Sequence, residues 1–473
     1  MNDDTLARAA AAALSRTTGD FRAVTQLVRL SGGASQETYQ LDVQLAEGAR
    51  RYVLRRSPGG AAPVGNVEQI GMPAEAKVLR AVAAAGVPVA RLVAELDPAD
   101  GAGEGFIADW LEGETLGHRI VKAPALDGIR PRLATECGRI LARIHGVDIA
   151  AHDLGSVLRT VDAAALVHSN WARYQSFGSP QPMIDYTAQW LLAHLPPPVA
   201  PALVHADFRN GNLMIDAQGI VGVLDWEISH LGDPMRDLGW LCTASWRFGV
   251  DQPVGGFGDY ADLFAGYEAE SGRPVDVARV RFWEVFGSFW WAIGCLFMMQ
   301  QYREGSDATV ERPAIARRSS ECQVDLVNLL LPAGEPAAHP GTRAATADED
   351  ADASMPSVFE LVSSVRDFLR QDVANSGQDR ARFLARVAAN SLDIALRDLR
   401  DGPAARTAEQ DRLQGLLGED APLPVLRRRL CEELRAGRLA LDDMALTAHL
   451  RATVVNEARI DQPGYPGVRK ATS

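Results

Sequence analysis

The densest group of polar side chains in the sequence lies in residues 203–214, which read LVHADFRNGNLM. Asp207 and Asn212 stand in this stretch, and Asp225 follows the next apolar run in the segment VLDWE. Transfer of a phosphoryl group from ATP requires Mg²⁺ held by hard oxygen ligands, which Asn212 and Asp225 offer. It also requires a carboxylate beside the acceptor hydroxyl, which Asp207 offers. The spacing therefore predicts Asp207, Asn212 and Asp225 as catalytic residues, with Asn212 and Asp225 as metal ligands.

The same residue types have simpler uses. Asp and Asn most often cap turns, and the alternative for Asp207 and Asn212 is such a capping role. The matching positions of His, Asp and Asn in one short loop, with Asp225 after the following strand, favour catalysis over capping. For His205 we expect structural support, in which the imidazole binds backbone groups and holds the loop.

A second motif follows, with the letters GDPMRDLGW at residues 232–240. Asp233 can cap a helix that has Pro234 at its first position. The combined pattern HxDxxxxN, DWE and GDPxxDL resembles the aminoglycoside phosphotransferase and choline kinase superfamily, over about residues 5 to 330. This resemblance implies a two-lobed protein-kinase-like fold, ATP and Mg²⁺ as cofactors, and supporting roles for Asp233 and Asp237.

The resemblance also indicates where nucleotide-binding residues should lie. A loop at residues 31–39, between the first two predicted strands, is expected to cover the ATP phosphates through Gly32, Gly33 and Ser35. The third strand carries Arg55 where protein kinases have lysine, and the acyl-CoA-dehydrogenase-associated branch of the family commonly has Leu-Arg there. Glu75 in the following helix is expected to pair with Arg55, and the alternative is a solvated helix-face glutamate.

The segment DWLEG at residues 109–113 resembles the hinge between kinase lobes, so Asp109 and Leu111 are expected at the adenine. The family often has methionine where this chain has Ala108, and its usual glycine after the loop histidine is Ala206. Neither difference removes a functional side chain.

Two further groups could contribute to an acceptor site. An aromatic run at residues 282–291 has helical spacing, which favours core packing over an apolar pocket wall. Arg209, Arg236 and Arg247 are near the catalytic loop in sequence and would favour an anionic acceptor, unless they only form surface pairs.

The remaining sequence predicts the elements that position these residues. A helix over residues 5–17 precedes strands near 24–30, 39–43, 52–54, 92–95 and 105–111, with a helix at 74–85. From residue 131 helical spacing dominates, interrupted by strands at 202–204, 213–216 and 220–224. We therefore predict an α+β fold with a small β-rich N-lobe (1–110) and a mostly helical C-lobe (111–330).

Beyond this fold, residues 331–356 are rich in Pro, Ala and acidic residues, which predicts a flexible linker. Residues 357–473 return to helical spacing and predict a small all-α accessory domain. This domain resembles an uncharacterised helical family that accompanies such kinases, including those acting on a 4-hydroxyacyl-CoA. We expect it to pack on the kinase or on a second copy.

Composition narrows the class of protein. The net charge of −13 excludes a general basic surface, so no nucleic-acid partner is expected. The five cysteines are scattered without a CxxC pair, which favours a reducing cytoplasm over a disulfide framework. No uninterrupted apolar stretch is long enough for a membrane span, and the acidic N-terminus does not resemble a signal peptide.

These observations predict an ATP- and Mg²⁺-dependent phosphotransferase that acts on a small-molecule alcohol. The preferred acceptor, taken from the resemblance, is a hydroxyacyl-CoA thioester. The alternatives are an aminoglycoside, choline, homoserine or sugar kinase and, from another class, a non-catalytic nucleotide-binding regulator.

Overall fold

The fold is taken from a computed structural model, which describes residues 3–30, 36–57, 69–332, 358–375 and 379–472. The predicted phosphate-loop residues Gly32, Gly33 and Ser35 lie outside the described residues. So does the predicted linker, except for its first two residues.

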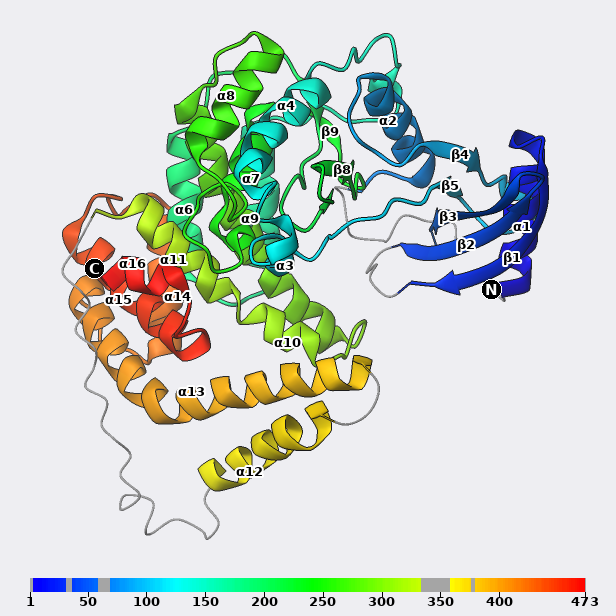
Figure 1. The fold of residues 1–473 in the computed structure, drawn as a ribbon. Coiled ribbons are helices and arrows are strands. Elements are labelled where there is room, and N and C mark those ends of the chain that lie inside the picture. Colours follow the sequence, from blue (N-terminus) through cyan, green and yellow to red (C-terminus); the bar gives the residue numbers. More distant parts are fainter. Residues whose placement is uncertain (1–2, 31–35, 58–68, 333–357, 376–378, 473) are drawn as a thin grey trace. The chain divides into compact units, whose positions relative to one another are not determined.

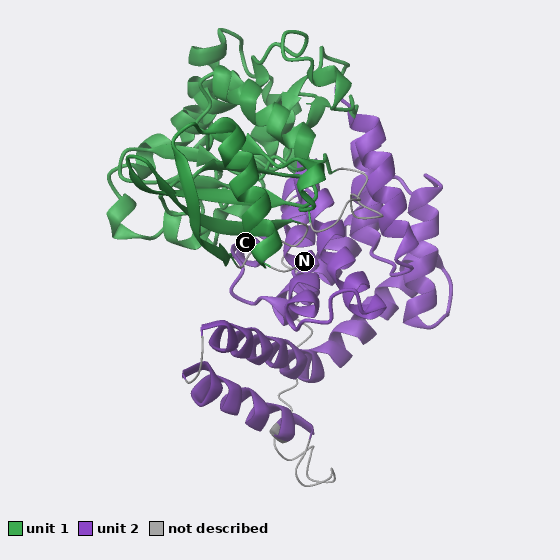
Figure 2. Ribbon diagram, turned by 90° about the vertical axis from the view of Figure 1, so that its right-hand side faces the viewer, with its two compact units in different colours: residues 1–162, 197–284 green, residues 163–196, 285–473 purple. Residues whose placement is uncertain are grey.

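The chain divides into two compact units (Figure 2). Unit 1 comprises Met1–Asp162 and Pro197–Glu284, and unit 2 comprises Ala163–Pro196 and Val285–Ser473. This grouping differs from the predicted ranges 1–110, 111–330, 331–356 and 357–473, because it combines the last helices with segments of the predicted C-lobe. The predicted ranges stay a prediction about folding units.

Unit 1 begins with a five-stranded antiparallel sheet in the order β1-β2-β3-β5-β4 (Figure 1). Its strands are β1 (Phe21–Arg29), β2 (Glu37–Leu45), β3 (Gly48–Arg56), β4 (Leu92–Glu95) and β5 (Gly105–Asp109). Alternate β2 residues, Tyr39, Leu41, Val43 and Leu45, are buried, as period-2 patterning requires. They share a core with Leu6 and Leu14 of helix α1 (Asp3–Thr17).

Four short strands flank the segments that carry Asp207, Asn212 and Asp225, and one helix carries another predicted site residue. Helix α2 (Met72–Ala84) contains Glu75, and it stops before Gly86, whose positive φ ends the helix. Strand β6 (Ala202–Val204) pairs with β9 (His230–Gly232), which the sequence did not predict, and β7 (Leu213–Ile215) pairs with β8 (Ile220–Val223).

The other helices of unit 1 are α3 (Gly117–Ile120), α4 (Leu133–His145), α7 (Met235–Cys242) and α8 (Tyr260–Ser271). Helices α4 and α8 approach closely at two glycines. A Cβ at Gly138 would lie 2.1 Å from the Leu263 carbonyl oxygen, and one at Gly266 would lie 2.1 Å from the Thr135 carbonyl oxygen. This packing therefore depends on the missing side chains.

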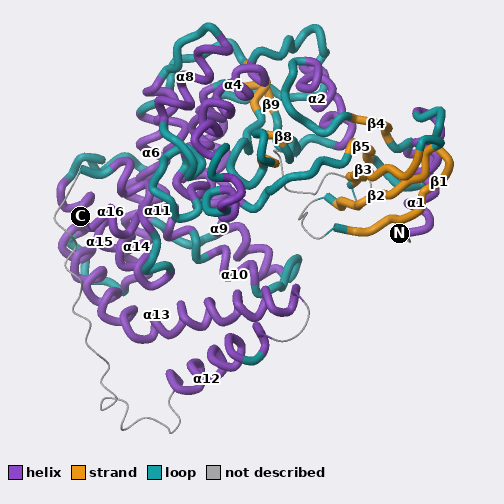
Figure 3. Tube along the Cα trace, viewed as in Figure 1, coloured by secondary structure: helices purple, strands orange, loops and turns teal. Residues whose placement is uncertain are grey.

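Unit 2 is entirely helical in its described part (Figure 3). It contains α5 (Ala163–Ser176), α6 (Pro182–Ala193), most of α9 (Val277–Glu304), α10 (Glu311–Ala316), α11 (Ser319–Leu330), α12 (Val358–Gln371), α13 (Asp379–Leu417), α14 (Leu423–Arg435), α15 (Met444–Asp461) and α16 (Pro466–Thr472). Helix α14 packs on α6, while α15 and α16 pack on α11. The last helices therefore contact segments that the sequence analysis assigned to the kinase lobe.

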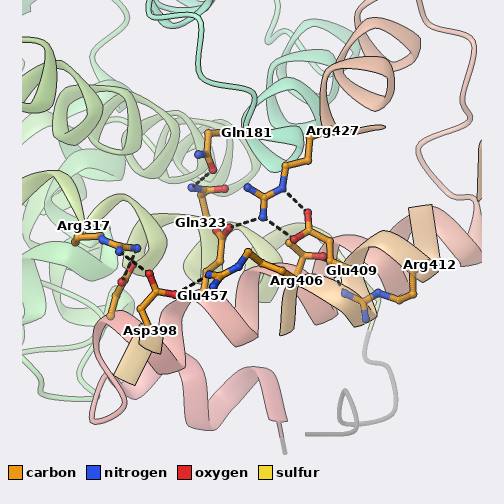
Figure 4. A network of polar contacts seen from close by, with 11 residues as sticks. Gln181, Arg317, Gln323, Asp398, Arg406, Glu409, Arg412, Arg427 and Glu457 are labelled. Carbon is orange, nitrogen blue, oxygen red and sulfur yellow. Dashed lines mark hydrogen bonds and ion pairs between the residues drawn. The ribbon is translucent and has the colours of Figure 1, made fainter. Parts of the chain in front are cut away.

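Polar contacts reinforce this packing (Figure 4). Arg427 of α14 binds both carboxylate oxygens of Glu409 on α13, at 2.6 and 2.5 Å, and also contacts Glu457 on α15. Arg317 contacts Asp398 of α13 and Asp461 of α15. Charged side chains thus connect α13, α14 and α15 with one another and with the turn between α10 and α11.

Among the described residues, one helix is long and apolar enough to cross a membrane, and it is α9. The most apolar window of α9 has a mean hydropathy of 1.3, and 61% of that window is buried within the protein. Buried core helices share these properties, so α9 is only weak support for a membrane span.

Candidate active site

The Asp207 carboxylate lies just after β6 and accepts three side-chain hydrogen bonds. Its Oδ1 accepts from Trp240 Nε1 at 2.8 Å and from Arg209 Nε at 3.0 Å, and its Oδ2 accepts from Asn212 Nδ2 at 2.6 Å. Burial raises the pKa of Asp207, while the Arg209 charge opposes that rise. The carboxylate is thus fixed in orientation, and 15% of its side chain stays exposed.

Asp237, near the start of α7, holds the backbone of the loop that contains Asp207. The Asp237 carboxylate accepts backbone N–H groups of His205 at 2.9 Å and Ala206 at 2.7 Å, and it contacts His145 Nε2 at 3.1 Å. Burial alone would raise the pKa of Asp237, but these hydrogen bonds and the nearby imidazoles lower it. Asp237 therefore lies where the predicted supporting role requires.

Ala206 adopts φ of +69°, a left-handed conformation that costs an alanine roughly 1–2 kcal/mol. The two hydrogen bonds to Asp237 therefore hold a strained backbone. The family usually has glycine where this chain has Ala206, and glycine would adopt this backbone conformation without strain.

His205 contacts only neighbouring backbone through its ring nitrogens. Nδ1 accepts the Asp207 N–H at 3.1 Å, so Nε2 is the nitrogen that carries hydrogen and donates to the Leu224 carbonyl at 3.1 Å. Burial lowers the pKa of His205, which favours the neutral ring. These are the backbone contacts predicted for a supporting imidazole.

Asn212 and Asp225 lie on adjacent hairpin strand ends, where the Leu224 N–H donates to the Asn212 carbonyl at 2.8 Å. The Asn212 amide nitrogen is engaged by the Asp207 carboxylate and carbonyl oxygens. Its Oδ1 is then the atom left for a cation, and Asp225 adds a carboxylate that is 37% exposed. This donor set fits Mg²⁺, which takes one or two protein oxygens together with substrate phosphates.

Arg55 on β3 lies between two carboxylates. Its Nη1 donates to Glu75 at 2.5 Å, its Nη2 donates to Gln36 Oε1 at 2.5 Å, and Asp225 lies 3.6 Å away. Burial disfavours the charged guanidinium, yet Glu75 and Asp225 outweigh it and raise the pKa of Arg55. Glu75 is wholly buried, so it is not a solvated helix-face residue. The sequence analysis did not predict Gln36, which also contacts Glu75 at 3.3 Å.

A cavity of about 620 Å³ within unit 1 is lined by Arg55, Asn212 and Asp225. Apolar side chains, among them Val53 and Met214, also line it. Asp109 and Leu111 line it as predicted for the hinge. The Asp109 carboxylate is bound by Arg91 at 3.0 Å, which leaves the hinge backbone as the group to meet an adenine. Apolar and charged side chains in one lining suit the base and the phosphates of a nucleotide, respectively.

Other predicted residues lie in supporting positions. Asp233 lies two residues before the first residue of α7 and accepts the Met235 N–H at 2.9 Å, and it binds Arg279 at 2.7 Å. Arg236 is buried and contacts His230, and Arg247 binds Glu284 at 3.0 Å. The expectation of three cations near the acceptor is therefore wrong for Arg236 and Arg247.

Arg209 and Trp240 both donate hydrogen bonds to Asp207, although the sequence pattern did not assign either to it. The Arg209 guanidinium lies over the Trp246 ring at 4.4 Å from its centroid, and the Trp240 and Trp246 rings are 5.0 Å apart. Trp240 lies two residues after the GDPxxDL motif, and nothing in its spacing marks it as a partner of Asp207. In the aromatic run, Phe282, Trp283, Phe286 and Phe289 are buried, as core packing predicts.

Two family models match the chain. One, described as the phosphotransferase enzyme family, matches residues 26–283, and the other, described as a domain of unknown function (DUF6285), matches residues 375–465. The first match includes every predicted site residue, and the second includes all of helices α13, α14 and α15.

Among curated relatives, acyl-CoA dehydrogenase family member 10 of Mus musculus is 31% identical over 229 residues, which are 46% of this chain and 20% of that protein. Acyl-CoA dehydrogenase family member 11 of Mus musculus is 28% identical over 232 residues, 47% of this chain and 28% of that protein. The chain thus spans between a fifth and a third of the length of these two relatives.

Among solved structures, a protein assigned as an aminoglycoside phosphotransferase from Ralstonia eutropha JMP134 superposes with a TM-score of 0.55. The two share 24% sequence identity over 68% of this chain and 96% of that chain. At this identity the similarity establishes the fold, a β-sheet lobe followed by a helical remainder.

Proposed function

Because the chain belongs to the phosphotransferase enzyme family, we propose that it transfers a phosphoryl group from ATP, with Mg²⁺, to the hydroxyl of a hydroxyacyl-CoA. The observation that carries this proposal is the contact of Asp207 with Asn212, whose amide shares one cavity with Asp225 and Arg55. Acid, amide and guanidinium groups are thus combined as phosphoryl transfer requires.

Asp207 is the residue that orients the acceptor hydroxyl and accepts its proton. Trp240 and Arg209 hold one carboxylate oxygen and Asn212 holds the other, which limits rotation of the group. A base held in one orientation needs no reorganisation when the acceptor arrives.

Asn212 and Asp225 are the residues that would hold Mg²⁺, and Arg55, fixed by Glu75, would bind the phosphates. The bound metal and nucleotide supply the phosphoryl group and neutralise charge on its oxygens. Arg55 offers a planar bidentate fork to phosphate oxygens, which suits this role despite the replacement of lysine.

Two observations support an acyl-CoA acceptor. The matched parts of both mouse relatives belong to proteins named as acyl-CoA dehydrogenase family members. Arg209 places a cation in contact with Asp207, which suits an anionic acceptor better than a polycationic aminoglycoside. The five cysteines are free and buried, so we place the enzyme in a reducing compartment, the cytoplasm.

The rival is a nucleotide-binding regulator without turnover. A regulator would not need the Asp207 carboxylate to be held by three hydrogen-bond donors beside the proposed metal ligands. This arrangement therefore supports catalysis. Choline, homoserine, aminoglycosides and sugars remain the alternative acceptors.

The test is a screen of the purified full chain with Mg·ATP and isotopically labelled γ-phosphate against 2-, 3- and 4-hydroxyacyl-CoAs, choline, homoserine, kanamycin and simple sugars. We expect label on a hydroxyacyl-CoA, seen by mass spectrometry as one added phosphoryl group. Transfer only to another acceptor would contradict the acyl-CoA assignment. Nucleotide binding without transfer to any acceptor would favour the regulator.

A further inference from the structure

Unit 2 contains two adjoining hollows that are unrelated to the residues of the active site. A groove of about 900 Å³ lies between the loop after α5 and helices α13 and α14. A cavity of about 440 Å³ lies between α9, α10 and α13. Ser179, in the loop between α5 and α6, lines both hollows.

The groove is basic. Arg406, Arg427 and Arg428 line it against one carboxylate, Asp420, which accepts a hydrogen bond from Gln414 at 2.6 Å. Both carboxylate oxygens of Glu409 accept hydrogen bonds from Arg427, which fixes the position of the guanidinium. Arg428 is exposed on the same helix, so the groove offers guanidinium donors to an anion.

The cavity is mainly apolar. Leu296, Met299 and Arg303 have the spacing of one face of α9, and Ser391 and Ile394 have the spacing of one face of α13. Leu296 and Met299 are half-buried although they are apolar, which marks them as walls of the hollow. A volume of this size is in the range of small-ligand sites.

A chain of ion pairs connects the two hollows (Figure 4). Asp398 accepts from Arg406 of the groove at 2.8 Å and contacts Arg317 of the cavity at 3.4 Å. Charged groups of alternating sign therefore continue from the groove to the edge of the apolar cavity.

We propose that unit 2 holds a second ligand site, which takes an acyl chain joined to a phosphorylated head, as in an acyl-CoA. The phosphates would bind in the groove near Arg428 and the acyl chain would enter the cavity beside Ala395. This inference goes beyond the proposed function, because the site contains no residue of unit 1 and does not require its ligand to be the phosphoryl acceptor.

The site would also give the C-terminal helices a role. Helix α13 supplies walls to both hollows and α14 supplies the groove arginines, while the α5–α6 loop, α9 and α10 complete them. Neither hollow exists without both segments of unit 2. Acyl-CoA binding would then depend on the C-terminal helices directly.

The experiment is calorimetric titration of the full chain carrying Asp207→Asn, so that turnover cannot interfere, in the presence of saturating Mg·ADP. The probes are octanoyl-CoA, CoA, octanoate and, as another source of acyl and phosphate groups, lysophosphatidate. We expect octanoyl-CoA to bind at least about tenfold more tightly than CoA or octanoate. Lysophosphatidate binding more tightly than octanoyl-CoA would overturn the assignment to a CoA thioester.

Two variants locate the site. Arg428→Ala should weaken octanoyl-CoA and CoA about tenfold and leave octanoate unchanged, and Ala395→Leu should reduce octanoyl-CoA affinity to that of CoA. The matched controls are Arg429→Ala on the same helix and Ala388→Leu on α13, which lie outside the residues lining either hollow. Unchanged octanoyl-CoA affinity in Arg428→Ala, an exposed position that tolerates truncation, would overturn the proposal. So would the absence of octanoyl-CoA binding while Mg·ADP saturates the nucleotide site.

Discussion

Asp185 on α6 and Arg435 on α14, 250 positions apart in sequence, form a two-point ion pair. Arg435 Nε donates to Oδ1 at 2.8 Å and Nη2 donates to Oδ2 at 3.0 Å. Asp185 is fully buried, and Trp171 and Tyr174 also donate to it. This pair attaches the C-terminal helices to the hairpin formed by α5 and α6.

Replacing Arg435 should therefore destabilise unit 2. Arg435→Ala leaves Asp185 buried without its cation, and breaking such a pair costs about 3–5 kcal/mol. Chemical denaturation of the full chain measures the loss. Arg429→Ala, whose ion pairs with Glu432 and Glu433 lie on the surface, should cost less than about 1 kcal/mol. Equal losses of stability in the two variants would show that the Asp185–Arg435 ion pair stabilises the protein no more than a surface ion pair does.

Ala206→Gly should stabilise the protein. Glycine adopts the positive φ of this position without strain, but it also raises the conformational entropy of the unfolded chain. The net gain in the free energy of unfolding should be about 0.5–1 kcal/mol. Ala142→Gly, buried in α4, is the control and should lose about 1 kcal/mol. A lower melting temperature for Ala206→Gly would mean that the methyl group contributes more by packing than it costs in strain.

Stability should fall as the pH rises from about 4 to 7. Burial raises the pKa of Asp461 to about 6 and that of Glu457 to about 7, with arginine charges opposing both shifts. Because the folded state binds more protons than the unfolded state in this window, each rise in pH favours unfolding. The variant Asp461→Asn/Glu457→Gln should have a flatter dependence of its melting temperature on pH. An unchanged slope would show that other groups cause it.

Asp225→Ala should abolish Mg²⁺-dependent nucleotide binding, because Asn212 alone is a neutral ligand. Calorimetry with Mg·ADP and with ADP plus chelator measures the difference. Asp216→Ala is the control, since Asp216 caps the turn between β7 and β8 and binds only backbone N–H groups there. If both variants keep the metal dependence of the parent protein, other residues hold the metal.

Local motifs explain what the sequence could predict. The α+β class with a β-sheet lobe and a helical remainder is confirmed, and so is membership of the phosphotransferase family. His205, Asp207 and Asn212 stand within one loop, so their order along the chain almost determines their arrangement. Arg55, Glu75 and the hinge come from separate elements, and only the family resemblance could connect them in advance.

Contacts between distant segments could not be predicted in this way. Nothing in the spacing of Trp240 or Gln36 indicates that they contact Asp207 and Arg55, since the geometry of the folded sheet and of α7 decides this. Arg236 and Arg247 were near the loop in sequence, but in the structure they bind His230 and Glu284, respectively. The pairing of Asp185 with Arg435 depends on how α6 packs on α14. The helical periodicity of one sequence does not show which helices pack together.

The most direct test of the central claim compares turnover and nucleotide affinity in Asp207→Asn. The asparagine keeps the shape of the side chain but cannot accept the acceptor proton, and Asn212, Asp225 and Arg55 remain to bind nucleotide. We expect phosphoryl transfer to fall by about a hundredfold or more while Mg·ADP affinity stays within about threefold of the parent protein. A variant that keeps more than about a tenth of the parent turnover would contradict the assignment of Asp207 as the catalytic base.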